Sequence, residues 1–149
     1  MVLTRESSAG YMTNWAARLF ARELERQLAP SGIAPAYMPV LFALADGSAL
    51  TQKELTRRAA VEQPTMAATL NRMQRDAMIV RTPDPEDRRS ALVALTPLAQ
   101  GHVETVERVV SAINELALEQ LDPAERRQFM ALLGKVIAVL EIQDATLGS

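Results

Sequence analysis

The chain has 149 residues, and its 48% hydrophobic and 23% charged residues are typical of one globular domain with a hydrophobic core. It has no cysteine and only one histidine, His102, which excludes disulfides and thiolate chemistry and argues against zinc sites and serine triads. No apolar run approaches the roughly 18 residues of a membrane span, and the N-terminus does not resemble a signal peptide. We therefore expect a cytoplasmic protein without a membrane partner.

The charge is unevenly distributed along the chain. The net charge is −2, which by itself argues against a nucleic-acid partner. Residues 48–90, however, contain eight Lys or Arg against six Asp or Glu, while the remainder carries a net charge of −4. Because the local field governs the approach of a charged partner, an acidic protein can still present a basic face.

The N-terminal third predicts two helices. Apolar residues at spacings of three and four predict a helix from about Tyr11 to Ala29, which Pro30 and Gly32 end. The almost wholly apolar segment 36–45 predicts a buried helix. Pro39 fits there only in the first turn, where its missing amide breaks no helical hydrogen bond.

Two short helices follow, joined by a turn. Thr51 and Glu54 form a capping-box pattern that predicts a helix to about Ala59. A second helix is expected from Gln63 to about Asp76, with Pro64 in its first turn. Its buried stripe would contain Met66, Leu70, Met73 and Ala77.

The opposite side of this second helix is small and polar at its start and cationic toward its end. It carries Thr65, Ala68, Asn71, Arg72 and Arg75. Small residues allow close approach to base edges, and arginines can bind guanine or backbone oxygens. A recognition helix of a helix-turn-helix has these properties, but an ordinary amphipathic surface helix with a solvated face has them too.

A hairpin with a charged tip is predicted next. Residues 79–82 and 91–95 favour two strands, separated by the polar loop 83–90. Arginine suits insertion into a narrow minor groove, and a nearby aspartate such as Asp87 can hold Arg89 in place. A solvated turn of mixed charge is the alternative, which the position directly after a recognition-helix candidate disfavours.

The C-terminal part predicts two more helices. Thr96 and Pro97 open a helix expected to reach about Gln120, and Asp122 caps a last helix whose tail, residues 144–149, should be frayed. Apolar residues of the last helix are expected to face inward; they are Phe129, Leu132, Leu133, Val136, Ile137 and Leu140. The apolar stripes of the terminal helices are too wide for one small monomer to bury, which predicts a homodimer.

The segments 50–81 and 84–96 (DPEDRRSALVALT) resemble the MarR family, whose wing carries an Asp-x-Arg core followed by a strand and a Thr-capped helix. The resemblance covers nearly the whole chain. It implies a mainly α fold with a small β-hairpin wing, one domain over residues 1–149, and a winged helix-turn-helix lobe over 48–95. Dimerisation helices would span 11–30 and 96–142.

The resemblance also implies a function, that of a transcriptional regulator, by family default a repressor, whose homodimer binds a palindromic double-stranded operator. The residues expected to bind DNA are Gln63, Pro64, Thr65, Ala68, Arg72, Arg75, Asp87, Arg88 and Arg89. Some relatives carry arginine where this chain has Ala68, so that base contact would be absent here.

Family members commonly release DNA when a small phenolic or aromatic acid binds. The lining residues expected for such a pocket are Tyr11, Trp15, Tyr37, Met38 and Phe42, although packing in the core or the dimer interface is the favoured explanation for them. No glycine-rich phosphate loop, HExxH or Gly-x-Ser-x-Gly motif occurs, so no catalytic residue, metal or cofactor is expected. The alternative function is a ligand-binding or protein-interaction module of this fold that has lost DNA binding.

Overall fold

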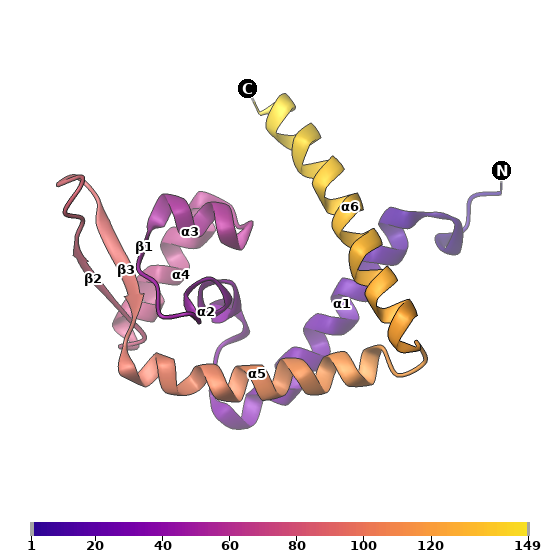
Figure 1. Ribbon diagram of the computed structural model, residues 1–149, viewed down its shortest axis with the longest axis horizontal. Helices are drawn as coiled ribbons and strands as arrows, with labels where there is room; N and C mark the ends of the chain where they lie inside the picture. Colours follow the sequence, from indigo (N-terminus) through magenta and orange to yellow (C-terminus); the bar gives the residue numbers. More distant parts are fainter. Residues whose placement is uncertain (1, 149) are drawn as a thin grey trace. The chain divides into compact units, whose positions relative to one another are not determined.

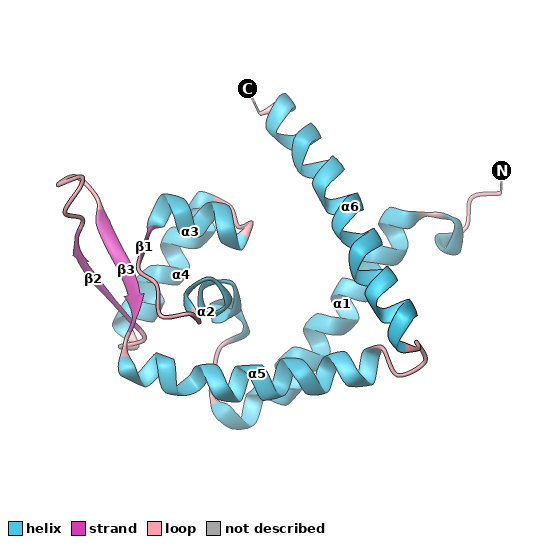
Figure 2. Ribbon diagram, in the orientation of Figure 1, coloured by secondary structure: helices cyan, strands magenta, loops and turns pink. Residues whose placement is uncertain are grey.

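The computed structural model describes residues 2–148, which are mostly helical and include one small antiparallel sheet (Figures 1 and 2). The predicted fold class, mainly α with a β-hairpin, is therefore confirmed. Internal contacts divide the chain into two compact units, residues up to 111 and residues from 112 onward, with the boundary inside helix α5 (Pro97–Ala117). Among the described residues, no helix is both long and apolar enough to cross a membrane.

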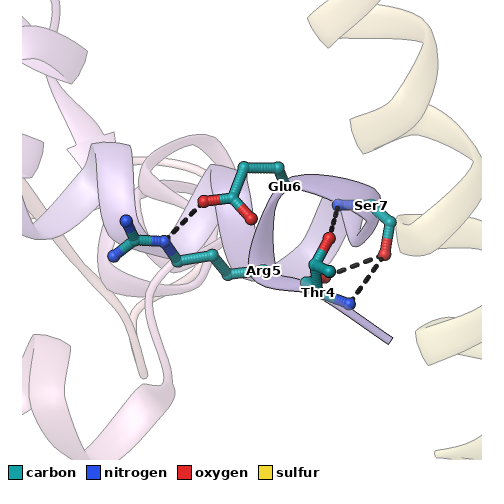
Figure 3. Close-up of polar contacts among 4 residues, drawn as sticks. All are labelled: Thr4, Arg5, Glu6 and Ser7. Atoms are coloured by element: carbon teal, nitrogen blue, oxygen red, sulfur yellow. Dashed lines mark hydrogen bonds and ion pairs between the residues drawn. The ribbon is translucent and has the colours of Figure 1, made fainter. Parts of the chain in front are cut away.

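The N-terminus begins with a short 3-10 turn, η1 (Arg5–Ser7), before helix α1 (Ala9–Leu28). Figure 3 shows the reciprocal cap of this turn: the Ser7 amide donates to Thr4 Oγ1 and the Thr4 amide donates to Ser7 Oγ, both at 3.2 Å. The Arg5 guanidinium pairs with Glu6 at 2.6 Å and lies 4.5 Å from the ring centroid of Trp15. The Ser8 side chain then caps α1.

The second helix begins so that Pro39 lies in its first turn, where the missing amide breaks no helical hydrogen bond. Two 3-10 turns, η2 (Ala29–Ser31) and η3 (Pro35–Tyr37), lead into α2 (Met38–Leu44), where Pro39 occupies the first turn as predicted. The expected start near residue 36 falls within η3, so the first turn of this helical segment is 3-10 rather than α. Gly32 takes a left-handed φ of 73° at the end of η2, a conformation that favours glycine.

The helix-turn-helix consists of α3 (Gln52–Ala59) and α4 (Gln63–Arg75). The predicted capping box at the start of α3 is present, with the Thr51 amide donating to Glu54 Oε2 at 2.9 Å and the Glu54 amide donating to Thr51 Oγ1 at 3.2 Å. The turn between the helices passes through Ala60, whose φ of 52° is left-handed.

The sheet contains the predicted hairpin and one further strand. Strands β2 (Ile79–Pro83) and β3 (Ala91–Leu95) pair antiparallel with Ile79 opposite Leu95 and Pro83 opposite Ala91. The third strand, β1 (Leu50–Thr51), which the sequence analysis did not predict, pairs with the other edge of β3, so the order is β1–β3–β2. Its two residues are too few to show an alternating pattern.

The core of the first unit lies among α2, α3, α4 and the sheet. Its fully buried side chains include Leu41, Leu44, Leu55, Leu70 and Val93, which come from four different elements. The predicted buried stripe of α4 is confirmed for Met66, Leu70 and Met73, whereas Ala77 lies beyond the helix and is exposed. This packing fixes the side of α4 that faces solvent.

The C-terminal helices differ from the sequence prediction at their ends. Helix α5 stops at Ala117, three residues before the predicted end, because the chain turns there toward the Asp122 cap of α6 (Pro123–Leu147). The prediction of a frayed tail was wrong for residues 144–147, which are helical; Ser149 lies outside the described residues. Thr146 Oγ1 donates to the Ile142 carbonyl at 2.8 Å, and the Gly148 amide donates to the Asp144 carbonyl at 3.0 Å.

The apolar side chains of α6 do not face inward in the single chain. Within the described helix none of its residues is buried. Of the six residues expected to face inward, Leu133 is half-buried, and Phe129, Leu132, Val136, Ile137 and Leu140 are exposed. The expectation of an inward face within one chain was therefore wrong.

Candidate nucleic-acid interface

The solvent-facing side of α4 carries every residue predicted to bind DNA there. These residues, Gln63, Pro64, Thr65, Ala68, Arg72 and Arg75, are all exposed, while the opposite side of the helix packs into the core. Small residues occupy the first two turns and the two arginines the last two. The geometry matches that of a recognition helix, and the DNA contacts themselves stay a prediction.

The wing tip is folded by its own acidic residues. The Glu86 amide donates to Asp84 Oδ1 at 2.9 Å, and the Arg89 amide donates to Asp87 Oδ1 at 3.0 Å. The Arg89 Nε also lies 3.4 Å from Asp87 Oδ1, which is the predicted aspartate–arginine contact. Because the Arg89 side chain is 93% exposed, this contact orients a guanidinium that is free to meet a phosphate or a groove.

The tip of the hairpin extends away from α2, α3 and α4 (Figure 1). Arg88 is also exposed, and no carboxylate lies within ion-pair distance of it among the described residues. Two cationic side chains therefore stand at the end of a hairpin that starts directly after the recognition-helix candidate. A fixed hairpin of this kind can enter a groove beside the helix.

Tyr37 holds the C-terminal end of α4 in place. This residue is only 4% exposed, and its hydroxyl donates to Asp76 Oδ2 immediately after the helix. The guanidinium of Arg72 lies 5.7 Å from the centroid of the Tyr37 ring. Burial, reinforced by the bond to Asp76, raises the pKa of Tyr37 above its ordinary value. The phenol therefore stays a neutral donor that fixes α4 against η3.

Two residues at the exposed side of α4, Arg81 and Gln74, were not assigned a role from sequence, and Asn71 was placed on that side without a partner. Arg81, in β2, donates from Nη2 to Asn71 Oδ1 at 3.3 Å and from Nη1 to Gln74 Oε1. The two amides lie on α4 and are exposed. The only signal in the sequence was the placement of Arg81 at an alternating position of the predicted strand, which does not identify its partners.

The five residues expected to line a ligand pocket do not share one cavity. Met38 and Phe42 line a cavity of about 740 Å³ beside α3, and Phe42 also lines one of about 350 Å³ between α2 and α5. Tyr37 lines a third, of about 270 Å³. Tyr11 is exposed, and Trp15 is half-buried next to Arg5; neither lines any of these three cavities.

The fold and the exposed cationic side of α4 define the class of the protein. A short helix and a recognition-helix candidate are followed by a hairpin with arginines at its tip, which is the arrangement of a winged helix-turn-helix DNA-binding protein.

Comparisons with known proteins agree with this class. The MarR family model matches residues 31–90. The chain is 30% identical to an uncharacterized HTH-type transcriptional regulator, YwoH of Bacillus subtilis, over 82% of this chain and 88% of that protein. It is 32% identical to the HTH-type transcriptional repressor NicR of Pseudomonas putida over 65% of this chain and 61% of that protein.

A solved structure extends the comparison to three dimensions. BpsR of Bordetella bronchiseptica, whose DNA binding is regulated by 6-hydroxynicotinic acid, superimposes with a TM-score of 0.83 at 26% identity. The match covers 91% of this chain and 97% of that one. The chain belongs to the MarR family and is a DNA-binding transcriptional regulator.

Proposed function

We propose that the protein is a repressor whose homodimer binds a palindromic operator through α4 and the wing. The main support is that four exposed arginines lie on one lobe. Arg72 and Arg75 lie on α4, and Arg88 and Arg89 lie at the folded tip of the hairpin. Arginines in this arrangement suit contacts to base edges and phosphates. The name of the related repressor NicR supports repression as the outcome. The regulator would act in the cytoplasm.

The exposed apolar surface of α6 supports the homodimer. The five exposed side chains described above are joined by Met130, Val139 and Ile142, all half-exposed or more. Covering this apolar surface would stabilise the protein by about 25 cal/mol per Å² removed from water. We propose a second copy of the chain as the cover, because most soluble oligomers are symmetric homodimers. Leu140→Glu would place a charge in this interface. It should weaken dimerisation at least tenfold in analytical ultracentrifugation, whereas Arg127→Glu, a charge change at an exposed position on the side of α6 away from these apolar residues, serves as the control.

DNA binding is tested by selecting bound fragments from the genome that encodes the protein and measuring affinity for the shared sequence. We expect a palindrome, and Arg89→Ala should reduce affinity by at least tenfold. Arg75→Ala should lower affinity evenly across sequences and reduce the salt slope by about one unit, because it removes one phosphate contact. Failure to bind any fragment would favour the alternative, a family member that has lost DNA binding, and binding that neither substitution changes would refute the contacts proposed for these two arginines.

We also propose that a small aromatic acid releases the operator. Phe42 is 61% exposed and lies at two cavities, one of them between α2 and the first half of α5. The regulation of the related BpsR by 6-hydroxynicotinic acid supports this ligand class. Titration of the protein–operator complex with 6-hydroxynicotinate and a panel of phenolic acids should lower affinity, and Phe42→Ala should blunt the effect. Unchanged affinity across the panel would remove the proposal.

A further inference from the structure

Arg81 connects the base of the wing to the exposed side of the recognition helix. Its backbone is fixed in β2 opposite Val93 of the central strand, so the residue belongs to the base of the hairpin and not to its tip. Its guanidinium reaches across to α4 and donates to the side-chain oxygens of Asn71 and Gln74. The contact joins the two elements that are proposed to meet DNA.

The chemistry of arginine sets the orientation of both amides. A guanidinium has only N–H donors, so the atom that each amide turns toward Arg81 must be its oxygen. The NH₂ group of each amide is then left for other partners. Asn71 and Gln74 are exposed and lie three residues apart, on neighbouring turns of α4. Arg81 therefore makes this part of the helix surface a source of hydrogen-bond donors.

The orientation matters for base recognition. An unrestrained asparagine amide can pair bidentately with adenine, for which it must present its oxygen and its nitrogen together. The bond from Arg81 occupies one of the two lone pairs of the Asn71 oxygen and fixes the plane of the amide, so pairing with adenine is disfavoured unless the base lies in that plane. With the oxygen held, the amide suits groups that only accept, namely guanine N7 and O6, thymine O4 or a phosphate oxygen.

We propose that Arg81 is a specificity-determining positioning residue. By holding the oxygens of Asn71 and Gln74, it directs the recognition helix toward acceptor edges of the major groove and away from adenine. The inference rests on the proposed function, since it assumes that α4 lies in the groove. Among the described residues, no carboxylate is within ion-pair distance of Arg81, so a direct phosphate contact by its charge is the competing explanation.

The test compares wild type with Arg81→Met, which keeps most of the length of the side chain and removes its donors. Both proteins select binding sites from randomised duplexes, and affinities for the selected sites and their single-base variants are measured over a range of salt. We expect wild type to require guanine or thymine at one half-site position. In Arg81→Met, the affinity for sites with adenine at that position should rise about tenfold relative to the affinity for sites with the preferred base. The salt slope should stay unchanged.

Four variants assign the effect. Asn71→Ala should relax the same half-site position, and the double variant with Arg81→Met should add nothing further there, because Arg81 acts through the amide. Asn71→Asp keeps an oxygen for Arg81 but has no donors, so it should lose the wild-type preference. Arg75→Met is the matched control: it removes an exposed cation from α4 that makes no hydrogen bond to either amide, and should weaken all sites evenly.

Two results would overturn the inference. The first is an unchanged base preference in Arg81→Met, with uniformly weaker binding and a salt slope lower by about one unit, which is the signature of a phosphate contact. The second is a change at a half-site position that is altered neither by Asn71→Ala nor by the equivalent alanine substitution of the other amide, Gln74→Ala. If wild type selects no sequence at all, the proposed function itself fails, a result distinct from both.

Discussion

Ala77 joins the recognition helix to the wing in a conformation that suits glycine. Its φ is 57°, in the left-handed region. An L-residue there costs roughly 1–2 kcal/mol, whereas glycine adopts it without a steric penalty. Glycine also loses about 0.4–1 kcal/mol more conformational entropy on folding. Because Ala77 is exposed, removing its methyl group sacrifices little burial. Ala77→Gly should therefore stabilise the protein by about 0.5–1 kcal/mol.

The measurement is urea unfolding followed by far-UV circular dichroism at one fixed protein concentration. The midpoint should rise, and the melting temperature should increase by about 1–4 °C for a chain of this size. Ala68→Gly, in the interior of α4, is the control and should cost about 0.8–1 kcal/mol. If Ala77→Gly were as destabilising as Ala68→Gly, the left-handed conformation at this joint would be refuted.

Three further substitutions test side-chain hydrogen bonds that hold the helices in place. Tyr37→Phe should cost about 0.5–1.5 kcal/mol at neutral pH by removing the bond to Asp76. Because the pKa of Tyr37 is raised in the fold, this contribution is complete below about pH 10 and is lost as the pH rises through the raised value. The free energies of unfolding of wild type and Tyr37→Phe, measured in urea at a series of pH values, should therefore converge at high pH. A difference between the two proteins that stays constant with pH would argue against the raised pKa. Thr51→Ala should cost about 1 kcal/mol by removing the cap of α3, and Thr51→Ser should restore most of it; equal losses in chemical denaturation would exclude capping. Arg126→Met should destabilise by about 1 kcal/mol, since its guanidinium binds Glu115 and the carbonyls of Leu118 and Leu121; an unchanged unfolding midpoint would show that these bonds contribute nothing.

The elements with strong local signals were predictable from sequence. The strand 91–95, the Thr51–Glu54 cap and the start of α4 at Gln63 were all predicted at the positions where the structure has them. Each depends on interactions within a few residues, or on an apolar pattern that a single element displays. The exposed side of α4 followed in the same way, because burial of Met66, Leu70 and Met73 determines which side faces solvent.

The features that the sequence did not reveal depend on distant partners. Strand β1 exists only because Leu50 and Thr51 pair with Val93 and Leu92, about forty residues later in the chain. The contacts of Arg81 with α4, and of Tyr37 with Asp76, likewise join elements whose approach no local pattern encodes. The helical tail of α6 was missed for another reason: residues 144–147 lack an apolar pattern, yet their helical hydrogen bonds continue to Gly148.

The salt dependence of operator affinity is the sharpest measurement of whether α4 and the wing bind DNA. If α4 and the wing bind DNA, the logarithm of the association constant should fall steeply and linearly with the logarithm of salt concentration, by about 0.9 for each phosphate that the protein neutralises. A variant with alanine at Arg75, Arg88 and Arg89 should have a slope shallower by about one unit for each phosphate that these arginines neutralise in the wild type. A wild-type affinity independent of salt, or a triple variant with the wild-type slope, would contradict the account.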